Sequence, residues 1–380
     1  MRCFEIFFLV DKINGACYIM LNVCVGMIKN KEESLEGIFM GENSQQNQIE
    51  ELKVYAAFCS NKLLLENSAS GGVATALSVD VIKSGGYVAG VSYTSDFHDA
   101  EYILVNDLET LKKLQGSKYI RAKLNGIYEK VKNLLESGIY VLFIGLPCNI
   151  AGLKKYCKKD YQNLLTCELI CDGPTKTEVH KQYIEYLEKK NGSKLDSFSV
   201  RHKKYGWPVS YLRAEFENGK VFSEEFYFTE YGYAFQLNKY EGCFNCQYKG
   251  LNYVGDLMIG DFWGAKDTDV FWNSDGISAI LVRNERADKF LKSVHSLVLF
   301  EENYERVVSN NKRIILPNEN TRDRQEFSKC FNKDGLFLSV NKMMPRSRKM
   351  IIKIKRLCPS NIRRLVELLY YKTTIKRKFH

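Results

Sequence analysis

The chain has 380 residues, of which 45% are hydrophobic and 13% aromatic, with only 6 prolines. This composition excludes a disordered or low-complexity chain and suffices for a sizeable core within two or three domains. The formal net charge of +10 is concentrated in residues 341–380, which hold 13 lysines and arginines against the single acid Glu367; the rest of the chain sums to about −2.

The apolar N-terminus does not have the order of a signal peptide, and no apolar run reaches the about 18 residues of a membrane span, so we expect a cytoplasmic protein. In that compartment, 12 cysteines favour reduced thiols, metal ligands or core packing over a disulfide framework. Residues 1–52 form a poorly defined N-terminal segment that ends in a polar linker.

Strand-like and helix-like segments alternate from Lys53 to Ser193. Strands are expected at 53–60, 87–93, 102–106, 139–145 and 163–170, and helices at 67–86, 107–115, 126–138, 149–157 and 177–190. We expect Asn67, Ser68 or Ser70 to cap the first of these helices. The alternation predicts an α/β fold, with a mostly parallel sheet and flanking helices.

The pattern changes after Ser193. Residues 210–228 read as an antiparallel hairpin whose turn is Glu217-Asn218-Gly219, so a hairpin subdomain is expected there. A strand at 256–261 and a strand and helix over 277–294 follow.

Residues 301–380 are expected to form a helical basic tail in which apolar and basic residues interleave over 341–380. Such a helix could contact an anionic membrane surface, making the protein peripheral to the inner membrane, or pack on the protein with a solvated basic face. No nucleic acid is expected as a partner, because no recognised reading motif accompanies the charge.

Cys243 and Cys246 form a CxxC motif, which alone fits a redox dithiol, half a zinc site or half an iron-sulfur site. Cys148 and Cys171 are each expected in a loop just past an apolar strand, and such strand ends meet at one edge of a parallel sheet. Four convergent thiolates suit a closed zinc site or a 4Fe-4S cluster equally. The alternative for Cys148 and Cys171 is core packing, the use expected of Cys59, Cys157 and Cys167.

Two glycine-containing turns could bind an anion. The Ser70-Gly71-Gly72 turn precedes a helix, where free N–H groups favour a phosphate or pyrophosphate, although a plain helix cap is the simpler use. In the Gly116-Ser117-Lys118-Tyr119 turn, Lys118 could meet a phosphate and Tyr119 could stack on a ring, unless the turn is merely solvated. Asp261 and Trp263, in a "GDFWG" loop, could line a flavin or substrate pocket, or Trp263 could simply pack on the turn.

Six blocks occur in order: "NSASGGVATAL", "LQGSKYIRA", "FIGLPCNIAGL", "CELICDGP", "GCFNCQYKG" and "DLMIGDFWG". Together they resemble the signature blocks of the coenzyme F-420 hydrogenase/dehydrogenase beta-subunit family, over about residues 53 to 295. The resemblance implies an N-terminal family region at 53–125 with a flavin-binding turn, and a C-terminal family region at 126–300 with the cysteines.

What the resemblance implies is an FAD-containing iron-sulfur oxidoreductase that passes electrons between a hydride donor, FAD and a 4Fe-4S cluster. The cluster ligands would be Cys148, Cys171, Cys243 and Cys246. The flavin contacts would be Ser70, Gly71, Gly72, Gly116, Ser117, Lys118 and Tyr119, with Asp261 and Trp263 also expected to face the cofactor.

The chain departs from this family in two places. The cysteines at 3, 17 and 24 do not have the CxxCxxCxxxCP spacing of a ferredoxin module, so a separate electron-transfer protein or a small-molecule hydride donor is expected as partner. Asp172 stands where similar sequences have "ICHG". Relatives of this length resemble proteins encoded beside surface-polysaccharide enzymes, and a zinc-stabilised or metal-free scaffold in such a pathway is the alternative function.

Overall fold

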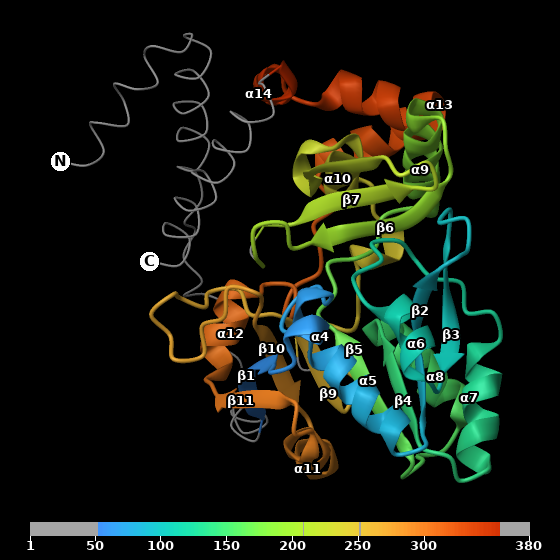
Figure 1. The fold of residues 1–380 in the computed structure, drawn as a ribbon, viewed down its shortest axis with the longest axis vertical. Coiled ribbons are helices and arrows are strands. Elements are labelled where there is room, and N and C mark those ends of the chain that lie inside the picture. The colour runs from blue at the N-terminus through green and yellow to red at the C-terminus, as the bar shows by residue number, and fades with distance from the viewer. Residues whose placement is uncertain (1–51, 208, 251, 358–380) are drawn as a thin grey trace.

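The computed structural model describes residues 52–357 except 208 and 251 (Figure 1). Outside the described residues lie nearly all of the expected N-terminal segment and the last 23 residues of the basic tail. The chain folds around an eight-stranded sheet with the order β11-β1-β10-β9-β5-β4-β2-β3 and a separate three-stranded sheet with the order β6-β7-β8.

The strands of the large sheet are β1 (Lys53–Cys59), β2 (Tyr87–Tyr93), β3 (Ala100–Val105), β4 (Val141–Gly145), β5 (Leu164–Leu169), β9 (Leu257–Asp261), β10 (Ser278–Val282) and β11 (Leu297–Glu301). The small sheet contains β6 (Leu195–His202), β7 (Tyr211–Phe216) and β8 (Val221–Glu225). The helices are α4 (Lys62–Glu66), α5 (Val73–Lys83), α6 (Leu108–Leu111), α7 (Ile127–Glu136), α8 (Pro147–Cys157), α9 (Thr177–Asn191), α10 (Glu230–Leu237), α11 (Glu285–Ser293), α12 (Tyr304–Asn310), α13 (Arg322–Met343) and α14 (Arg346–Leu357).

The large sheet is parallel at its centre and antiparallel at its edges. Strands β2, β4, β5 and β9 pair in parallel, whereas β3 on one side and β10, β1 and β11 on the other pair antiparallel. The predicted α/β class is therefore confirmed, and the parallel part supplies the strand ends on which the site depends. The hairpin at 210–228 is also confirmed as β7 and β8, and β6 adds a third strand.

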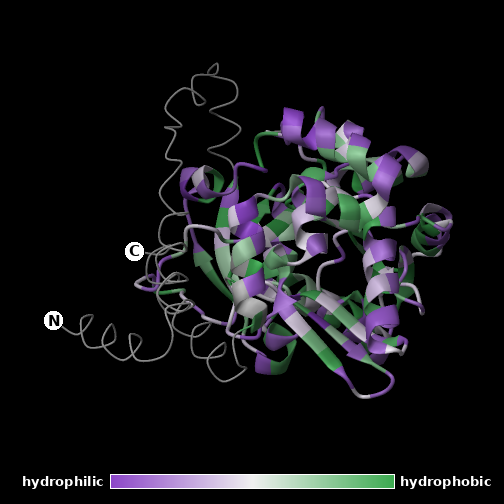
Figure 2. Cartoon of the chain, turned by 90° about the horizontal axis from the view of Figure 1, so that it is seen from above, coloured by the Kyte–Doolittle hydropathy of each residue, from purple (hydrophilic) through white to green (hydrophobic). Residues whose placement is uncertain are grey.

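Apolar residues on both faces of the large sheet explain why helices cover both sides. Along β1, Tyr55 and Ala57 pack in the core beneath α5 and α11, whereas Val54 and Ala56 pack in the core beneath α12. Another core joins β4 to α7 and α8. Figure 2 shows apolar green concentrated on the strands and polar purple on the outer helices. Neighbouring residues of β1 pack on opposite faces of the sheet, because side chains along a strand alternate between the two faces.

The small sheet forms a second layer with α9, α10 and α13 around its own aromatic-rich core, at the top of Figure 1. Its buried members include Tyr183, Phe226, Tyr231 and Phe327. The described part of the expected basic tail contains the helices α12, α13 and α14, with a non-helical loop between α12 and α13. Helix α14 begins against this layer: Arg348 donates to the Tyr227 carbonyl, and its guanidinium carbon lies 5.0 Å from the centre of the Tyr233 ring. Among the described residues, no helix combines the length and apolar character that a membrane span requires.

Candidate functional site

A cavity of about 520 Å³ opens where the parallel strands of the large sheet end. Its floor is made by residues at the carboxyl ends of β4, β5 and β9, namely Gly145, Ile170 and Asp261. The turn before α5 and the turn at 115–119 form further walls. Ligands of open α/β sheets bind at this edge, and cavities of this size hold small molecules and cofactors.

The glycine-rich turn enters α5 without a side-chain cap. Gly72 is the N-cap, with φ of 77°, so the expectation that Asn67, Ser68 or Ser70 caps this helix is wrong. The Ser70 hydroxyl instead donates to the Ile277 carbonyl at 2.8 Å. Ser70 and Gly72 line the cavity, whereas Gly71 packs against β10, where a Cβ would lie 2.6 Å from the Ser278 nitrogen. The turn thus leaves the first N–H groups of α5 free of side-chain partners.

The second turn, Gly116 to Tyr119, also lines the cavity with all four of its residues. Lys118 Nζ donates to the carbonyls of Gln115 at 2.7 Å and Lys113 at 2.9 Å. Burial lowers the pKa of Lys118 to about 7. The Tyr119 ring stacks on Phe235, with 4.5 Å between ring centres. Lys118 is therefore a desolvated amine beside a cavity and not a solvated surface charge.

Asp261 is held by an arginine that lies in the small sheet. Arg201 donates to both Asp261 oxygens at 2.8 Å and to the Ala69 carbonyl at 2.8 Å, and Trp207 Nε1 donates to Asp261 at 2.7 Å. Burial raises the pKa of Asp261, but the adjacent Arg201 guanidinium outweighs burial and lowers it below its ordinary value. The Asp261 carboxylate is thus an ionised anchor that fixes Arg201 beside the glycine-rich turn.

Trp263 lines the cavity and also stacks on Trp207, with ring centres 5.4 Å apart. The sequence did not identify Arg201 as a site residue. Its segment, "RHKKYGWPVS", has no motif or spacing that marks Arg201 as a binding residue.

Tyr102 on β3 is a second cavity residue without a sequence signal. Its buried hydroxyl has no hydrogen-bond partner among the described residues, and burial raises its pKa well above the ordinary range. A buried hydroxyl without a partner costs free energy. The cavity therefore offers a hydrogen-bonding group that a bound molecule could satisfy.

The four candidate cysteines come from two loops and the start of one helix. Cys171 follows β5 and lines the cavity, and Cys243 and Cys246 lie partly exposed in the segment after α10. Cys148 was expected in a loop, but it lies in the first turn of α8, directly after Pro147, where it is exposed. Proline suits this first helical position because its missing N–H is not needed there. Cys59, Cys157 and Cys167 are buried in the core, as expected.

The four thiols affect each other electrostatically. Burial raises the pKa of Cys171 to about 11, and the neighbouring charges of Cys148 and Cys243 add to this effect. Burial likewise raises the pKa of Cys148 and of Cys243, and Cys246 contributes to both increases. All four thiols are free. Among residues 52–357, apart from 208 and 251, no three His, Cys, Asp or Glu side chains are grouped closely enough to hold a single metal ion.

Gly173 allows two of the cysteine loops to approach each other closely. Its N–H donates to Cys171 Sγ at 3.2 Å, and a Cβ at this position would lie 3.1 Å from Cys243 Cβ. Its φ of 79° also favours glycine. A larger residue here would push the loop after β5 away from the CxxC segment.

Cations surround this group of thiols. Lys239 Nζ donates to the Gly173 carbonyl at 2.7 Å, and Lys249 Nζ donates to the Cys171 carbonyl at 2.7 Å. Arg121 favours the thiolate forms of Cys148 and Cys243. These contacts create a positive environment that would stabilise negative charge on the sulfurs.

Asp172, the departure noted in the sequence, joins the Cys171 loop to the chain before α13. Its carboxylate accepts from Arg313 Nε at 3.0 Å, Asn318 Nδ2 at 3.1 Å and Lys239 Nζ at 3.2 Å. Asp172 therefore has a structural use as an anchor of three partners.

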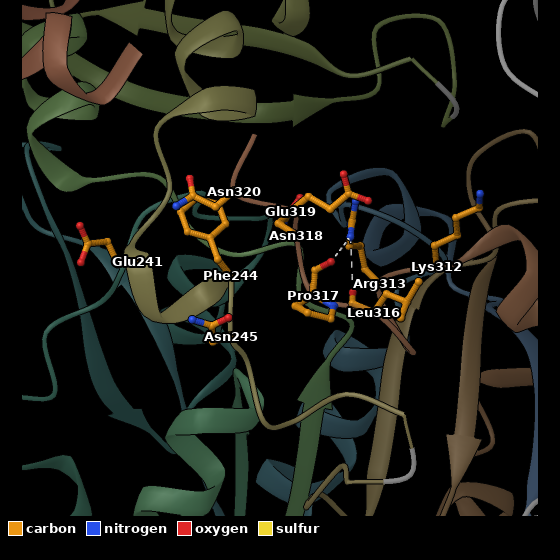
Figure 3. A pocket seen from close by; sticks show the side chains of 10 residues that line it. All are labelled: Glu241, Phe244, Asn245, Lys312, Arg313, Leu316, Pro317, Asn318, Glu319 and Asn320. Carbon is orange, nitrogen blue, oxygen red and sulfur yellow. Dashed lines mark hydrogen bonds between the residues drawn. The ribbon is translucent and has the colours of Figure 1, made fainter. Parts of the chain in front are cut away.

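The same segment borders a groove of about 720 Å³ beside the CxxC motif (Figure 3). Glu241, Phe244 and Asn245 of the CxxC segment line it, together with Lys312, Arg313, Leu316, Pro317, Asn318, Glu319 and Asn320. Asn318 is hydrogen-bonded to Asp172, which follows Cys171, and Phe244 lies between the two CxxC cysteines in the chain. The groove therefore adjoins two of the loops that carry the candidate cysteines.

Comparisons with known proteins identify the family. The family model described as "Coenzyme F420 hydrogenase/dehydrogenase, beta subunit N-term" matches residues 54–127, and the companion model for the C-terminal region of the same beta subunit matches residues 140–305. The chain is similar to one in the structure of the F420-reducing [NiFe] hydrogenase complex from Methanosarcina barkeri, with 15% identity and a TM-score of 0.46 over 74% of this chain and 94% of that chain.

No curated protein sequence matches the chain. The two family models are the N-terminal and C-terminal regions of one type of beta subunit, they occur here in that order, and together they cover more than half of the chain. The chain therefore belongs to the coenzyme F420 hydrogenase/dehydrogenase beta-subunit family.

Proposed function

We propose that the protein is an iron-sulfur flavoprotein oxidoreductase that passes electrons between a hydride donor, FAD and a 4Fe-4S cluster. The observation that carries this proposal is the position of Cys171, which lines the cavity and also lies within electrostatic reach of Cys148 and Cys243. A cofactor in the cavity and a cluster on the thiols would be direct neighbours.

The ligands that we propose for the cluster are Cys148, Cys171, Cys243 and Cys246. The type of donor fits the group, because such clusters take four cysteine thiolates and none of these four cysteines is in a disulfide. The close contact between the Cys171 loop and Cys243 at Gly173 supports the same assignment. The cations around the sulfurs also support it, because a cluster with thiolate ligands carries net negative charge.

The residues that we propose for the FAD site are Ser70, Gly71, Gly72, Gly116, Ser117, Lys118, Tyr119, Asp261 and Trp263, all of which except Gly71 line the cavity. The free N–H groups at the start of α5 and the Lys118 amine suit the pyrophosphate. Gly71 would act by letting the turn pack on β10, and Asp261 by holding Arg201, so neither needs to touch the cofactor. The unpartnered Tyr102 hydroxyl supports the presence of a polar ligand.

When bound, FAD would accept a hydride and release its two electrons singly, and the cluster would carry single electrons. The chain's own contribution would be to hold the two groups against each other through the loop at 171–173 and to keep water from the buried side of the cavity. We also propose that residues 53–125 supply the flavin turns and residues 126–300 the cysteines.

Purification without oxygen, followed by an absorption spectrum and assays for iron, sulfide, zinc and acid-released flavin, tests the proposal. We expect a brown protein with about four iron atoms and one FAD per chain. Cys243→Ser should lose iron and keep FAD, whereas Cys330→Ser, a partly exposed free cysteine outside the group, should keep both. A colourless protein with one zinc and no flavin would instead support the scaffold function.

The partner that we propose is a separate electron-transfer protein or a small-molecule hydride donor. The pathway that we propose is surface-polysaccharide biosynthesis, on the strength of the resemblance described above. Loss of surface polysaccharide in a deletion strain, restored by the wild-type chain and not by Cys243→Ser, would support both the pathway and the need for the cluster.

A further inference from the structure

Lys239 is a buried lysine that the sequence did not single out. Its side chain is fully buried, with 0% exposure. It follows α10 in a segment that pairs with the chain after the Cys171 loop, through a bridge between Thr175 and Lys239. Four residues later the chain reaches Cys243. Lys239 thus lies between two of the loops that carry the proposed cluster ligands.

The charge of Lys239 is incompletely balanced. Among the described residues its one carboxylate partner is Asp172 at 3.2 Å, and that carboxylate is 45% exposed and shared with Arg313. Its closest oxygen is the neutral carbonyl of Gly173 at 2.7 Å. A buried ammonium group is costly unless further negative charge lies nearby. Burial accordingly lowers the pKa of Lys239, and Asp172 and Cys171 oppose this effect only in part.

The same ammonium group also touches the wall of the cavity. Its nitrogen lies 3.5 Å from the centre of the Phe235 ring, which lines the cavity and stacks on Tyr119. On its other side is the loop of Cys171, and Lys239 favours the thiolate form of Cys243. Lys239 is therefore placed between the aromatic wall of the cavity and the group of thiols.

We propose that Lys239 is a positioning residue whose positive charge stabilises the reduced form of the cluster and draws electrons from the cavity toward the thiols. This inference rests on the proposed function above. With both groups bound, transfer of one electron from reduced flavin to the cluster would form and break no bond and would add one negative charge to the cluster and its four thiolates. A fixed cation nearby, such as the Lys239 ammonium, would favour that added charge.

The test measures the midpoint potential of the cluster in the anaerobically purified full chain, by redox titration followed by electron paramagnetic resonance. Lys239→Met should lower the equilibrium constant for one-electron reduction about tenfold, which corresponds to a potential about 59 mV more negative. The matched control is Lys154→Met. Lys154 Nζ also donates to a backbone carbonyl, that of Val254 at 2.7 Å, but its charge acts on Glu168 and Asp256. Its variant should keep the wild-type potential.

A Lys239→Met chain that retains its iron and its wild-type potential would overturn the proposal. If Lys239→Met loses iron, the comparison of Lys239→Arg with Lys239→Gln decides. Arginine keeps the positive charge and should keep the wild-type potential, whereas the uncharged glutamine should make the potential about 59 mV more negative. Equal potentials in these two variants would contradict the electrostatic role. Wild-type protein without iron would refute the proposed function itself, which keeps the two failures distinguishable.

Discussion

At the scale of single residues, Lys118 makes the affinity for a phosphate-bearing ligand depend on pH. Its pKa of about 7 means that the amine is charged below neutrality and increasingly neutral above it. An anion binds the charged form, so we expect the affinity for FAD to fall as the pH rises through 7. Titration of the cofactor-free protein with FAD between pH 6 and 9, followed by flavin fluorescence, measures this.

Lys118→Arg provides the informative comparison, because guanidinium stays charged over the whole range and should flatten the pH dependence. Lys130→Gln, an exposed change on α7 outside the cavity, should keep the wild-type profile. Equal pH profiles for the wild type and Lys118→Arg would remove Lys118 from the binding site.

Arg201 and Asp261 form a buried ion pair, so removing one partner should be costly. Their side chains are 8% and 14% exposed. Arg201→Met leaves the Asp261 carboxylate buried without its cationic partner, and we expect the free energy of unfolding to fall by about 3 kcal/mol. Arg213→Met, which breaks the partly exposed pair with Glu215, should cost less than about 1 kcal/mol. Urea denaturation of both variants measures the difference, and equal costs would contradict the importance of the buried pair.

At the scale of elements, the turn into α5 requires Gly72 for two separable reasons. Its φ of 77° disfavours any side chain, and a Cβ would lie 3.0 Å from Cys59 Cβ. Gly85, beyond the other end of α5, has φ of 81° but no atom within 4 Å of its Cβ position. We therefore expect Gly85→Ala to cost about 1 kcal/mol and Gly72→Ala about 1 kcal/mol more, by urea denaturation. Only Gly72→Ala should also weaken FAD binding; matching losses in both variants would argue against a role for this turn in the site.

The elements themselves were largely predictable, because apolar runs such as 141–145 and 164–169 report burial directly. Strand direction was less accessible: β1, β10 and β11 are apolar runs too, yet they pair antiparallel, and an apolar run carries no information on direction. The CxxC motif was visible as local spacing. Arg201 was not, because it meets Asp261 only through contact between two sheets, 60 residues apart in the chain.

At the scale of the whole molecule, the proposed site needs both layers. The large sheet supplies the strand ends and Cys171, whereas the small sheet and α10 supply Arg201 and Phe235 to the same cavity. Lys239 then follows α10 to the cysteine loops. Residues that complete the cavity therefore come from an insertion between β5 and β9, two strands that pair directly in the large sheet. Arg201 and Phe235 are therefore distant in the sequence from the strand ends beside which the fold places them.

The basic tail is the remaining feature of the whole chain, and it can be tested against a membrane surface. Residues 341–380 carry a net charge of +12, and Met350 and Leu357 expose apolar side chains on α14. Each Lys or Arg near an anionic surface contributes about 1 kcal/mol to binding, so the full chain should sediment with phosphatidylserine-containing vesicles at low salt. About 0.5 M salt should release it, because the Debye length there is roughly half its physiological value. It should not sediment with neutral phosphatidylcholine vesicles.

A chain ending at Leu357, which lacks six of the basic residues, should bind more weakly. Equal sedimentation with both vesicle types, or none with either, would favour a tail that packs on the protein, as the contact of Arg348 with Tyr233 begins to do.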